Sequence, residues 1–438
     1  MRLEYIRRED MKDLPPDQLA WACRVNALYM VAKAGRGHLG TSLSSMEAIL
    51  AIRKLMGEND VFIGSKGHDA AAQYAVLVSL GILEEELVPT FRQNQTPSLP
   101  GHPELGTSGI YANSGSLGMG LSKAIGFARR GQGVVYVLLG DGEMMEGQNW
   151  EAVLFAKKKK VENIIALVDC NELSQDGPVF LNIDQIFNMF RGAGWTTIVV
   201  KNGNNYQDVW MALVNMRNKI ELGPTAILLH TTKGYGILEF HDKAQSHAGP
   251  PNDYIKALLN LKGMLPLDMQ YTQGDEYVYS PKSRHPLSAA FGAAVMEVLK
   301  ENPEVVVLGM DTLDDHGLVA DGRRIIDCGI AEQNAVSMAS GLALDGFKPI
   351  VVTYARFLSR AHEQIYNQTT EGTAVVYVGS MAGLLPPEGP GKSHESLNDG
   401  VVMGTMMQVL SPQKEGVAGA LKWGVDSSLP LYIRLMQQ

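Results

Sequence analysis

The sequence is poor in cysteine and has no long apolar run. Its three cysteines, Cys23, Cys170 and Cys328, are odd in number and far apart, and no C-x-x-C pair is present. A disulfide framework and a cysteine metal site are therefore excluded, which fits a reducing compartment. No apolar stretch approaches the roughly 20 residues that cross a bilayer, and the charged start, MRLEYIRRED, lacks the core of a signal peptide. We expect a soluble, cytoplasmic protein with no membrane partner.

The sequence also lacks an excess of basic residues. Its formal net charge is −9 and its pI is near 5.6, which argues against a nucleic-acid-binding surface. The single basic run, Lys157 to Lys160, follows an apolar stretch, and we expect it to end a helix. The 438 residues are too many for one compact core and enough for two α/β domains.

Short apolar runs typical of buried parallel strands alternate with helical patterns. VVYVLLG from Val134, NIIALV from Asn163 to Val168 and TAILLH from Thr225 to His230 each end in polar or glycine-rich residues. This alternation predicts a doubly wound, mostly parallel sheet flanked by helices. Ligands of such sheets bind beyond the carboxyl ends of the strands.

The alternating pattern occurs twice. We expect a first domain over residues 1–265, a linker over 266–283 that is rich in Pro, Gly, Asp and Tyr, and a second domain over 284–438. The second domain is predicted to contain helices over Leu287 to Lys300 and over Glu332 to Leu344, among further strands. Both domains are therefore expected to be of the α/β class.

Oxygen-bearing residues follow two of the predicted strands in the first domain. Gly140-Asp141-Gly142 ends one strand and Asn171 ends the next, so both are expected at one edge of the sheet. With the backbone carbonyl of Leu173 they form a set suited to Mg²⁺, or to Ca²⁺ or Mn²⁺, beside a bound diphosphate. The glycines let phosphates approach the backbone. Taken alone, a GDG turn is equally a plain strand-to-helix connection, and no Walker A loop is present.

At these residues the sequence resembles the transketolase family. The motif GDGEMMEGQNWEA…VDCNELSQDG is similar to its thiamine-diphosphate motif. Similar segments follow the family order: AGRGHLGTSLSS (34–45), SKGHDAAAQYAVL (65–77), LPGHPE (99–104), NSGSLGMGLSKAIG (113–126), TTKGYG…SHAGPPND (231–253) and, in the second domain, DCGIAEQNAVSMASGLALDGFKPIVVTYARFLSRAHEQI. The resemblance implies two thiamine-diphosphate-binding domains, the first for the diphosphate and metal and the second for the pyrimidine.

The resemblance also implies roles for single residues. Glu332 matches the glutamate that hydrogen-bonds the aminopyrimidine ring, and a buried carboxyl there keeps its proton at neutral pH. Phe357 matches the ring that stacks on the pyrimidine, and Tyr354 extends that wall. Gly115 and Leu117 match the loop that approaches the diphosphate and thiazolium. Singly, Glu332 is equally a helix-start carboxylate and either ring is equally a core residue.

Acidic and histidine residues extend the predicted site. Glu146, also placed at the cofactor, and Glu151 match residues that link the two sites of a transketolase homodimer, although both also suit a solvated helix face. Five histidines match active-site positions and suit proton transfer: His38, His68, His102, His247 and His394. Each one alone is more often a structural histidine.

Departures from the family concern the substrate. His38, His394 and Arg284 match substrate-binding positions, with Arg284 a phosphate contact. Met381, in GSMAG, stands where the family has a substrate histidine, PPEGPGKSHES lacks an aspartate that reads a sugar hydroxyl, and IRLMQQ lacks a phosphate-binding arginine. We therefore expect a less phosphorylated or non-sugar acceptor.

Three functions remain open from the sequence. The first is transfer of a two-carbon ketol or acyl unit from a ketose-type donor to an aldehyde-type acceptor, in a homodimer whose site lies between subunits. The second is a synthase that decarboxylates a 2-oxo acid, like deoxyxylulose-phosphate synthase. The third is a silent, cofactor-binding subunit. Family members usually carry a carboxyl-terminal domain, so we expect a naturally short enzyme or a separate chain that supplies the rest.

Overall fold

The computed structural model describes residues 2–93, 97–277, 284–385 and 389–436. These residues divide into two compact units. The first unit comprises residues 1–281 with 387–390, and the second comprises residues 282–386 with 391–438.

A five-stranded parallel sheet forms the centre of the first unit. Its order is β2 (Val61–Gly64), β3 (Val135–Gly140), β4 (Ile164–Cys170), β6 (Thr225–His230) and β5 (Thr196–Val200). The three strands predicted from apolar runs are β3, β4 and β6, which are confirmed. They are almost wholly buried because helices cover both faces, and this explains their continuous apolar pattern.

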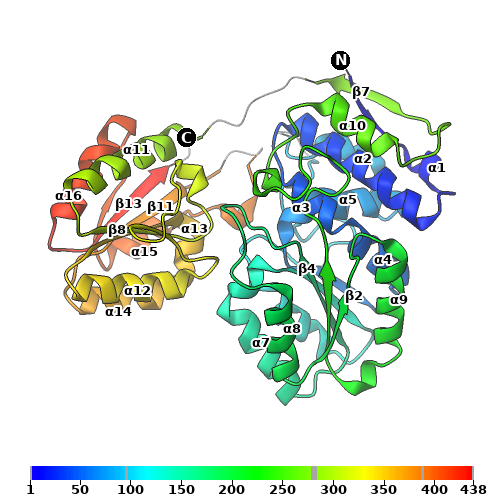
Figure 1. Ribbon diagram of the computed structural model, residues 1–438, viewed down its shortest axis with the longest axis horizontal. Helices are drawn as coiled ribbons and strands as arrows, with labels where there is room; N and C mark the ends of the chain where they lie inside the picture. The colour runs from blue at the N-terminus through cyan, green and yellow to red at the C-terminus, as the bar shows by residue number, and fades with distance from the viewer. Residues whose placement is uncertain (1, 94–96, 278–283, 386–388, 437–438) are drawn as a thin grey trace. The chain divides into compact units, whose positions relative to one another are not determined.

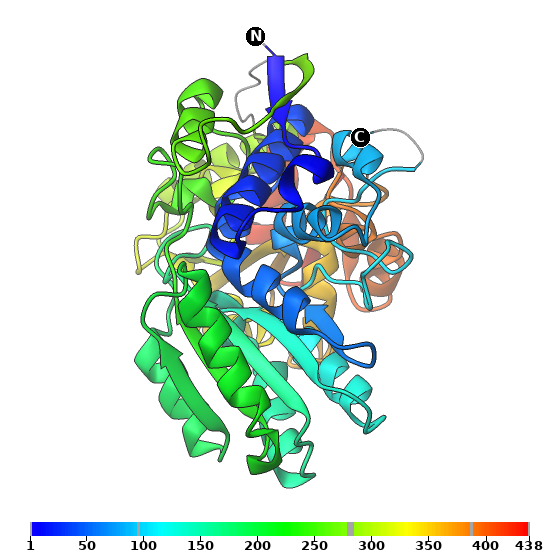
Figure 2. The same ribbon diagram turned by 90° about the vertical axis from the view of Figure 1, so that its right-hand side faces the viewer.

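Helices pack on both faces of this sheet. The helices of the first unit are α1 (Arg8–Met11), α2 (Pro16–Ala34), α3 (Leu39–Ser44), α4 (Met46–Leu55), α5 (Ala70–Ser79), α6 (Gly120–Ala128), α7 (Gly147–Lys158), α8 (Ile183–Gly192), α9 (Tyr206–Arg217) and α10 (Tyr254–Lys262). Helices α7 and α8 lie on one face and α4 and α9 on the other (Figure 1). Figure 2 shows the strands side by side, with α2, in blue, beyond one end of them. The predicted basic helix end is confirmed, since Lys157 and Lys158 occupy the last turn of α7.

One strand of a small antiparallel pair lies within the segment that was expected to be a linker. Strand β7 (Thr272–Glu276) pairs with β1 (Arg2–Tyr5), so that Arg2 faces Glu276 and Tyr5 faces Thr272. Leu3 is buried. This part of residues 266–283 therefore belongs to the first unit.

The second unit contains a six-stranded parallel sheet. Its order is β12 (Gln408–Leu410), β13 (Leu431–Met436), β11 (Val376–Ala382), β10 (Lys348–Tyr354), β8 (Val305–Gly309) and β9 (Ile325–Asp327). Its helices are α11 (Pro286–Glu301), α12 (Glu332–Leu344), α13 (Ala355–Leu358), α14 (His362–Thr370), α15 (Asp399–Gly404) and α16 (Val417–Asp426). Figure 1 shows α11 and α16 on one face and α12 and α14 on the other. The predicted doubly wound architecture is confirmed in both units.

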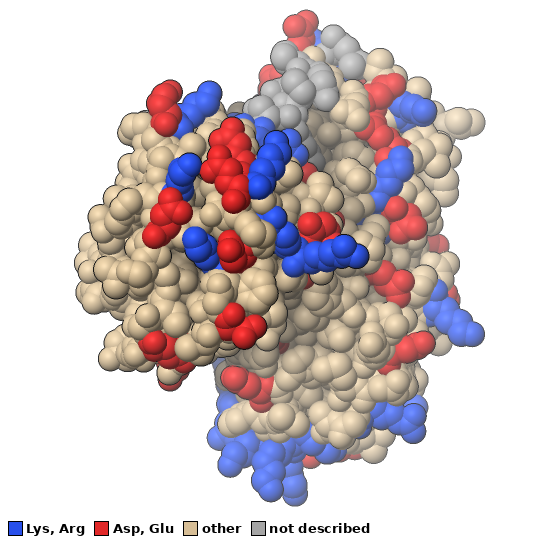
Figure 3. Space-filling model, turned by 60° about the vertical axis from the view of Figure 1, so that its left-hand side comes forward, with Lys and Arg blue, Asp and Glu red and all other residues tan. Residues whose placement is uncertain are grey.

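Charge is interspersed over the surface that Figure 3 shows. Acidic and basic side chains alternate there, apart from one basic cluster at the lower edge. Among the described residues, no helix combines the length and the apolar character that crossing a membrane requires. The three cysteines are buried and form no disulfide.

Two glycines lie in helices of the second unit, and we expect their replacement by alanine to change the free energy of unfolding in opposite directions. At Gly292 in α11, a Cβ would lie 1.8 Å from the carbonyl oxygen of His316, whereas at Gly341 in α12 nothing lies within 4 Å. Gly292→Ala should therefore lower the free energy of unfolding by about 1–3 kcal/mol. Gly341→Ala should raise it by about 0.5–1 kcal/mol, because alanine is the better helix former. Urea unfolding of both variants measures this, and equal changes would contradict the packing at Gly292.

Candidate active site

The predicted metal-binding residues lie together at the carboxyl ends of β3 and β4. Asp141 is buried, and its carboxylate accepts from the backbone amides of Gly142 at 2.8 Å and Glu172 at 2.5 Å. Glu172 is the residue after Asn171, so this hydrogen bond brings Asp141 close to Asn171. The side-chain oxygen of Asn171 accepts from the backbone amide of Leu173 at 3.2 Å. Burial, and next the charge of Asp169, raise the pKa of Asp141 to about 7. A cation at this edge would relieve that penalty on the charged carboxylate.

A buried ion pair underlies this edge. Lys66 donates to the carboxylate of Asp169, which also accepts from Ser44 Oγ at 2.6 Å and from the Thr231 hydroxyl. Burial opposes the charge of Asp169, but Lys66 holds the pKa of that carboxyl below its usual range. The same carboxylate accepts from the amide nitrogen of Asn171 at 3.3 Å. The Lys66–Asp169 pair therefore positions the predicted metal-binding residues.

A second buried lysine contacts the predicted carbonyl ligand. Lys233 Nζ donates to the carbonyl oxygens of Leu173 at 2.9 Å and Ser174 at 2.7 Å, and it lies 3.2 Å from Nδ1 of His247. Two buried ammonium groups, Lys66 and Lys233, therefore lie around the Asp141 edge. This donor set fits a polyanion such as a diphosphate. In the described part of the chain, no three His, Cys, Asp or Glu side chains could hold a metal, so phosphate oxygens would have to complete the coordination.

The glycine-rich loop that was predicted to approach the cofactor is held by Glu143. This buried carboxylate accepts from the amides of Gly118 at 2.7 Å and Gly140 at 3.1 Å. Gly115, in the same loop as Leu117, has a φ of 142°, which favours glycine. Glu143 therefore joins the loop to the end of β3.

The two acidic residues predicted for α7 lie in different surroundings. Glu146 caps the start of α7 and is buried, and a Cβ on Gly118 would lie 2.6 Å from its Cβ. Glu151 is exposed one turn later. The solvated-face alternative therefore describes Glu151 and not Glu146.

Four of the five predicted histidines form one cluster in the first unit. The ring of His38 lies 5.8 Å from His68, 5.4 Å from His102 and 5.3 Å from His247, and His68 lies 5.4 Å from His247. The absence of a side chain at Gly40 allows the segment with His247 to approach the segment with His38. A Cβ at position 40 would lie only 2.4 Å from the carbonyl oxygen of Ser246. The cluster gathers residues that are more than 200 positions apart.

His102 is an uncharged member of this cluster. Its Nδ1 donates to the carbonyl oxygen of Pro390 at 2.9 Å. Burial lowers the pKa of His102 to about 4, so the ring is uncharged at pH 7 and its Nε2 is a hydrogen-bond acceptor.

Glu332 opens helix α12 in the second unit and is buried. Within the described residues its Oε2 has no hydrogen-bond partner, and Arg360 Nη1 lies 3.7 Å away. Burial raises the pKa of Glu332 to about 7. The side chain therefore holds its proton near neutrality, as the sequence predicted for this position.

The predicted aromatic wall is present in the same unit. The rings of Tyr354 and Phe357 are 5.2 Å apart, and His394 lies 5.8 Å from Tyr354 and 5.0 Å from Phe357. His394 thus joins the aromatic pair, while the other four predicted histidines lie in the first unit. Arg284 is half exposed and donates to Asp314.

Asp69 yields a prediction on pH. It is fully buried, Oδ1 accepts from Gln73 at 2.6 Å, and Oδ2 has no hydrogen-bond partner among the described residues. Burial raises the pKa of Asp69 to about 7, whereas an unfolded aspartate titrates at about 3.9. Between these values the folded state keeps a proton that the unfolded state has lost. Stability of the cofactor-free protein should therefore fall as pH rises through this window, and it should level off above pH 7.

The neutral variant Asp69→Asn tests this origin. It should reduce the slope of unfolding free energy against pH by up to about 1.4 kcal/mol per pH unit between pH 4 and 7. Urea unfolding at pH 5, 6, 7 and 8 measures both proteins. Equal slopes in the two would rule out Asp69 as the source.

Known proteins identify the family. Residues 16–304 match the family described as "Transketolase, thiamine diphosphate binding domain", and residues 285–438 match "Transketolase, pyrimidine binding domain". The chain belongs to the transketolase family. The expected fold class, two thiamine-diphosphate-binding α/β domains of a transketolase, is thereby confirmed.

Curated relatives cover this chain to different extents. Transketolase-like protein 2 of Mus musculus is 32% identical over 378 residues, which are 78% of this chain and 59% of that protein. Transketolase of Mus musculus is 29% identical over 426 residues, 86% of this chain and 66% of that protein. The 6-deoxy-6-sulfo-D-fructose transketolase subunit SqwG of Clostridium sp. (strain MSTE9) is 34% identical over 238 residues, 50% of this chain and 86% of that protein. The chain spans about three fifths to two thirds of the first two relatives.

Solved transketolases share the fold. The Pichia stipitis transketolase in complex with sedoheptulose 7-phosphate has a TM-score of 0.55 at 21% identity, and the match covers 97% of this chain and 77% of that one. Transketolase from Campylobacter jejuni has a TM-score of 0.53 at 20% identity, and the match covers 97% of this chain and 78% of that one.

Sequence reasoning missed four buried residues of this candidate site. Lys66, Glu143, Asp169 and Lys233 all lie inside motifs that were recognised as similar to the family, yet none was assigned a role. A charged residue inside a predicted buried strand, as at Asp169, was the available signal.

Proposed function

We propose that the chain is a thiamine-diphosphate-dependent, transketolase-like transferase. It moves a two-carbon ketol or acyl unit from a ketose-type donor to an aldehyde-type acceptor. The observation that carries this proposal is Glu332, a buried carboxyl at a helix start whose pKa is raised to about 7 and whose Oε2 has no hydrogen-bond partner among the described residues. Such a group is able to donate a proton to a ring nitrogen.

The first unit supplies the groups that would hold the cofactor. Asp141, Asn171 and the carbonyl of Leu173 would bind Mg²⁺, while the amides beside Gly140 and Gly142 and the loop with Gly115 would face the diphosphate. The raised pKa of Asp141 supports the metal assignment, and the two buried lysines support the diphosphate. Thiamine diphosphate supplies, when bound, a thiazolium that stabilises negative charge on the carbon it attacks.

The remaining steps belong to side chains of this chain. Glu332 shares its proton with the pyrimidine and so fixes the tautomer of that ring, while Phe357 and Tyr354 form an aromatic wall against it. The histidines at positions 38, 68, 102 and 247 exchange protons with substrate hydroxyl and carbonyl oxygens. His102, whose pKa burial lowers to about 4, is uncharged at pH 7 and offers Nε2 as a hydrogen-bond acceptor.

The proposal extends to organisation. We assign diphosphate and metal binding to residues 1–265 and pyrimidine binding to residues 284–438, with a homodimer as the working assembly, as the family resemblance implies. A cytoplasmic location agrees with three buried thiols that form no disulfide.

Cofactor binding and turnover test this function in sequence. Titration with thiamine diphosphate, followed by circular dichroism, should saturate with Mg²⁺ present and fail after chelation by EDTA. Mass spectrometry then screens ketose donors and 2-oxo-acid donors against aldehyde acceptors. Saturation without turnover of any pair would favour the silent subunit, and absence of saturation would contradict the proposal. Sedimentation of the loaded protein reports whether it is a dimer.

A further inference from the structure

The candidate substrate-binding arginine is engaged by a carboxylate of its own chain. Arg284 Nε donates to the carbonyl oxygen of Asp314 at 2.8 Å, and Nη2 donates to Oδ1 of the same residue at 3.1 Å. Nε and Nη2 form the edge of a guanidinium that grips a phosphate with two parallel hydrogen bonds. In this chain one residue already takes both bonds.

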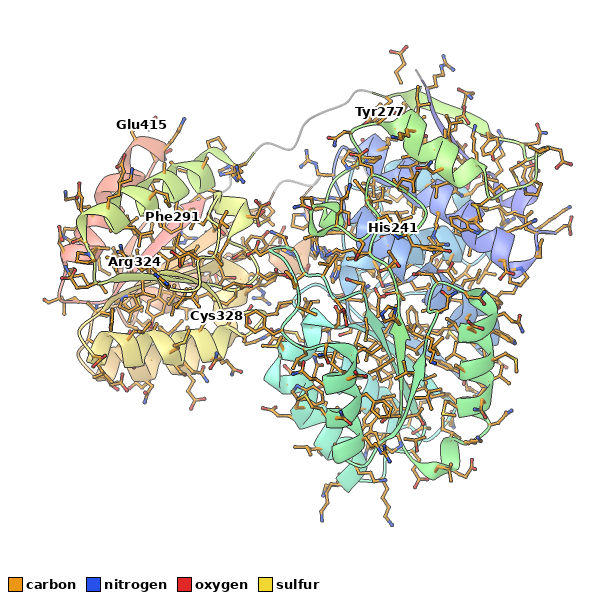
Figure 4. The ribbon with its side chains drawn as sticks, in the orientation of Figure 1. His241, Tyr277, Phe291, Arg324, Cys328 and Glu415 are labelled. Atoms are coloured by element: carbon orange, nitrogen blue, oxygen red, sulfur yellow. The ribbon has the colours of Figure 1, made fainter. Side chains whose placement is uncertain are left out.

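Packing, rather than the exposed ion pair itself, holds Asp314 in this place. Asp314 begins the short helix η6 (Asp314–His316), whose His316 is buried and meets the ring of Phe291 edge-on at 5.2 Å (Phe291 is labelled in Figure 4). Gly292 lets the backbone of His316 approach α11 closely. Asp315 accepts from the hydroxyl of Tyr354, so η6 also touches the aromatic wall.

The ends of two neighbouring strands carry uncharged side chains. Met381 lies near the end of β11 and Met436 ends β13, and the register pairs Ala382 with Met436. Met381 has a φ of 52°, a conformation that costs free energy for a non-glycine residue and is typical of functional sites. The methyl group of Met436 lies against Gly383. Ligands bind at this edge of such sheets, and the arginine closest to it on β13, Arg434, is paired with Asp399.

We propose that Asp314 is a specificity-determining residue that excludes phosphorylated substrates. The acceptor is an unphosphorylated aldehyde, and the ketose donor likewise ends in an uncharged group. A phosphate carries about −1.5 to −2 charges at pH 7 and would meet the Asp314 carboxylate as a like charge. This inference rests on the proposed function, because it names the substrate class of the same site.

Matched acceptors test the inference in the loaded enzyme. With 3-hydroxypyruvate as donor, one CO₂ is released and one proton is taken up for each ketose formed, whether D-ribose or D-ribose 5-phosphate is the acceptor. Wild type should show a kcat/KM at least about tenfold higher for ribose. Asp314→Ala should shift that ratio about tenfold toward ribose 5-phosphate, and adding Arg284→Ala should reverse the shift. Asp345→Ala, which removes the same charge elsewhere in the second unit, should leave the ratio unchanged.

Three outcomes of the acceptor assay would overturn the inference. They are a wild-type preference for ribose 5-phosphate, an unchanged ratio in Asp314→Ala, and a preference for an acceptor that ends in sulfonate. A binding arm separates this inference from the function itself. Inorganic phosphate titrated calorimetrically should bind about tenfold more tightly to Asp314→Ala than to wild type, whether or not any donor is turned over. Equal binding would overturn the inference, whereas absent turnover alone would contradict only the proposed function.

Discussion

Replacing Glu332 by alanine is expected to lower kcat about 10²- to 10⁴-fold while the protein still folds and binds thiamine diphosphate. The size follows from the loss of a positioned proton donor, which typically contributes that factor. Burial raises the pKa of Glu332 to about 7, so the wild-type group carries the required proton near neutrality. Steady-state turnover, with circular dichroism to follow cofactor binding, measures the two effects separately.

Two further variants delimit this role. Glu332→Gln keeps the shape of the side chain and a hydrogen-bond donor but does not transfer a proton. Its kcat should therefore fall nearly as far as that of Glu332→Ala. Glu301→Ala removes an exposed carboxylate that pairs with Lys422, and its kcat should match wild type. A Glu332→Ala enzyme that turns over at the wild-type rate would refute the proposed chemistry.

Loss of Lys66 is expected to have the largest effect on stability. Lys66→Met leaves Asp169 buried without its cation, and removal of one partner of a buried pair typically costs about 3–5 kcal/mol. Asp169 also accepts from Asn171, so Mg²⁺ affinity should fall in the same variant. Urea unfolding gives the first quantity, and Mg²⁺ titration in the presence of thiamine diphosphate gives the second.

The double variant Lys66→Met/Asp169→Asn is the matched control. It removes both charges, so it should recover part of the lost unfolding free energy. Metal affinity should not recover with it, because the hydrogen bonds that orient Asn171 are weakened. If the single and double variants unfold at the same urea concentration, Lys66 and Asp169 are not energetically coupled.

The parallel sheets could be predicted because buried strands leave continuous apolar runs in the sequence. Strands β3, β4 and β6 were found this way, and their order along the chain was enough to expect Asp141 and Asn171 at one edge. Strand β7 reads TQGDE and escaped notice, because it is polar and mostly exposed and so has no apolar alternation. Strand β5 is only partly buried and escaped for a similar reason.

Contacts between residues that are far apart in the sequence limit how much of the site could be predicted. Lys66 and Asp169 are 103 positions apart in the sequence, and no local sequence pattern predicts that they form a pair. The histidines were expected individually from resemblance, but their mutual distances depend on the fold. Glu146 and Glu151 occupy the same helix region, and only the packing of Gly118 shows that Glu146 is the buried one.

The pairing of β1 with β7 makes the first unit a closed module. Residues 2–5 and 272–276 pair as neighbouring strands. Just after β1, the side chain of Asn26 accepts from the backbone amide of Ile6 and donates to its carbonyl oxygen. A polypeptide whose two ends are neighbours tolerates being cut out, fused elsewhere or rejoined with new termini. Residues 2–276 are therefore suited to production as one independent protein, in which the hydrogen bond from His102 to Pro390 would be missing.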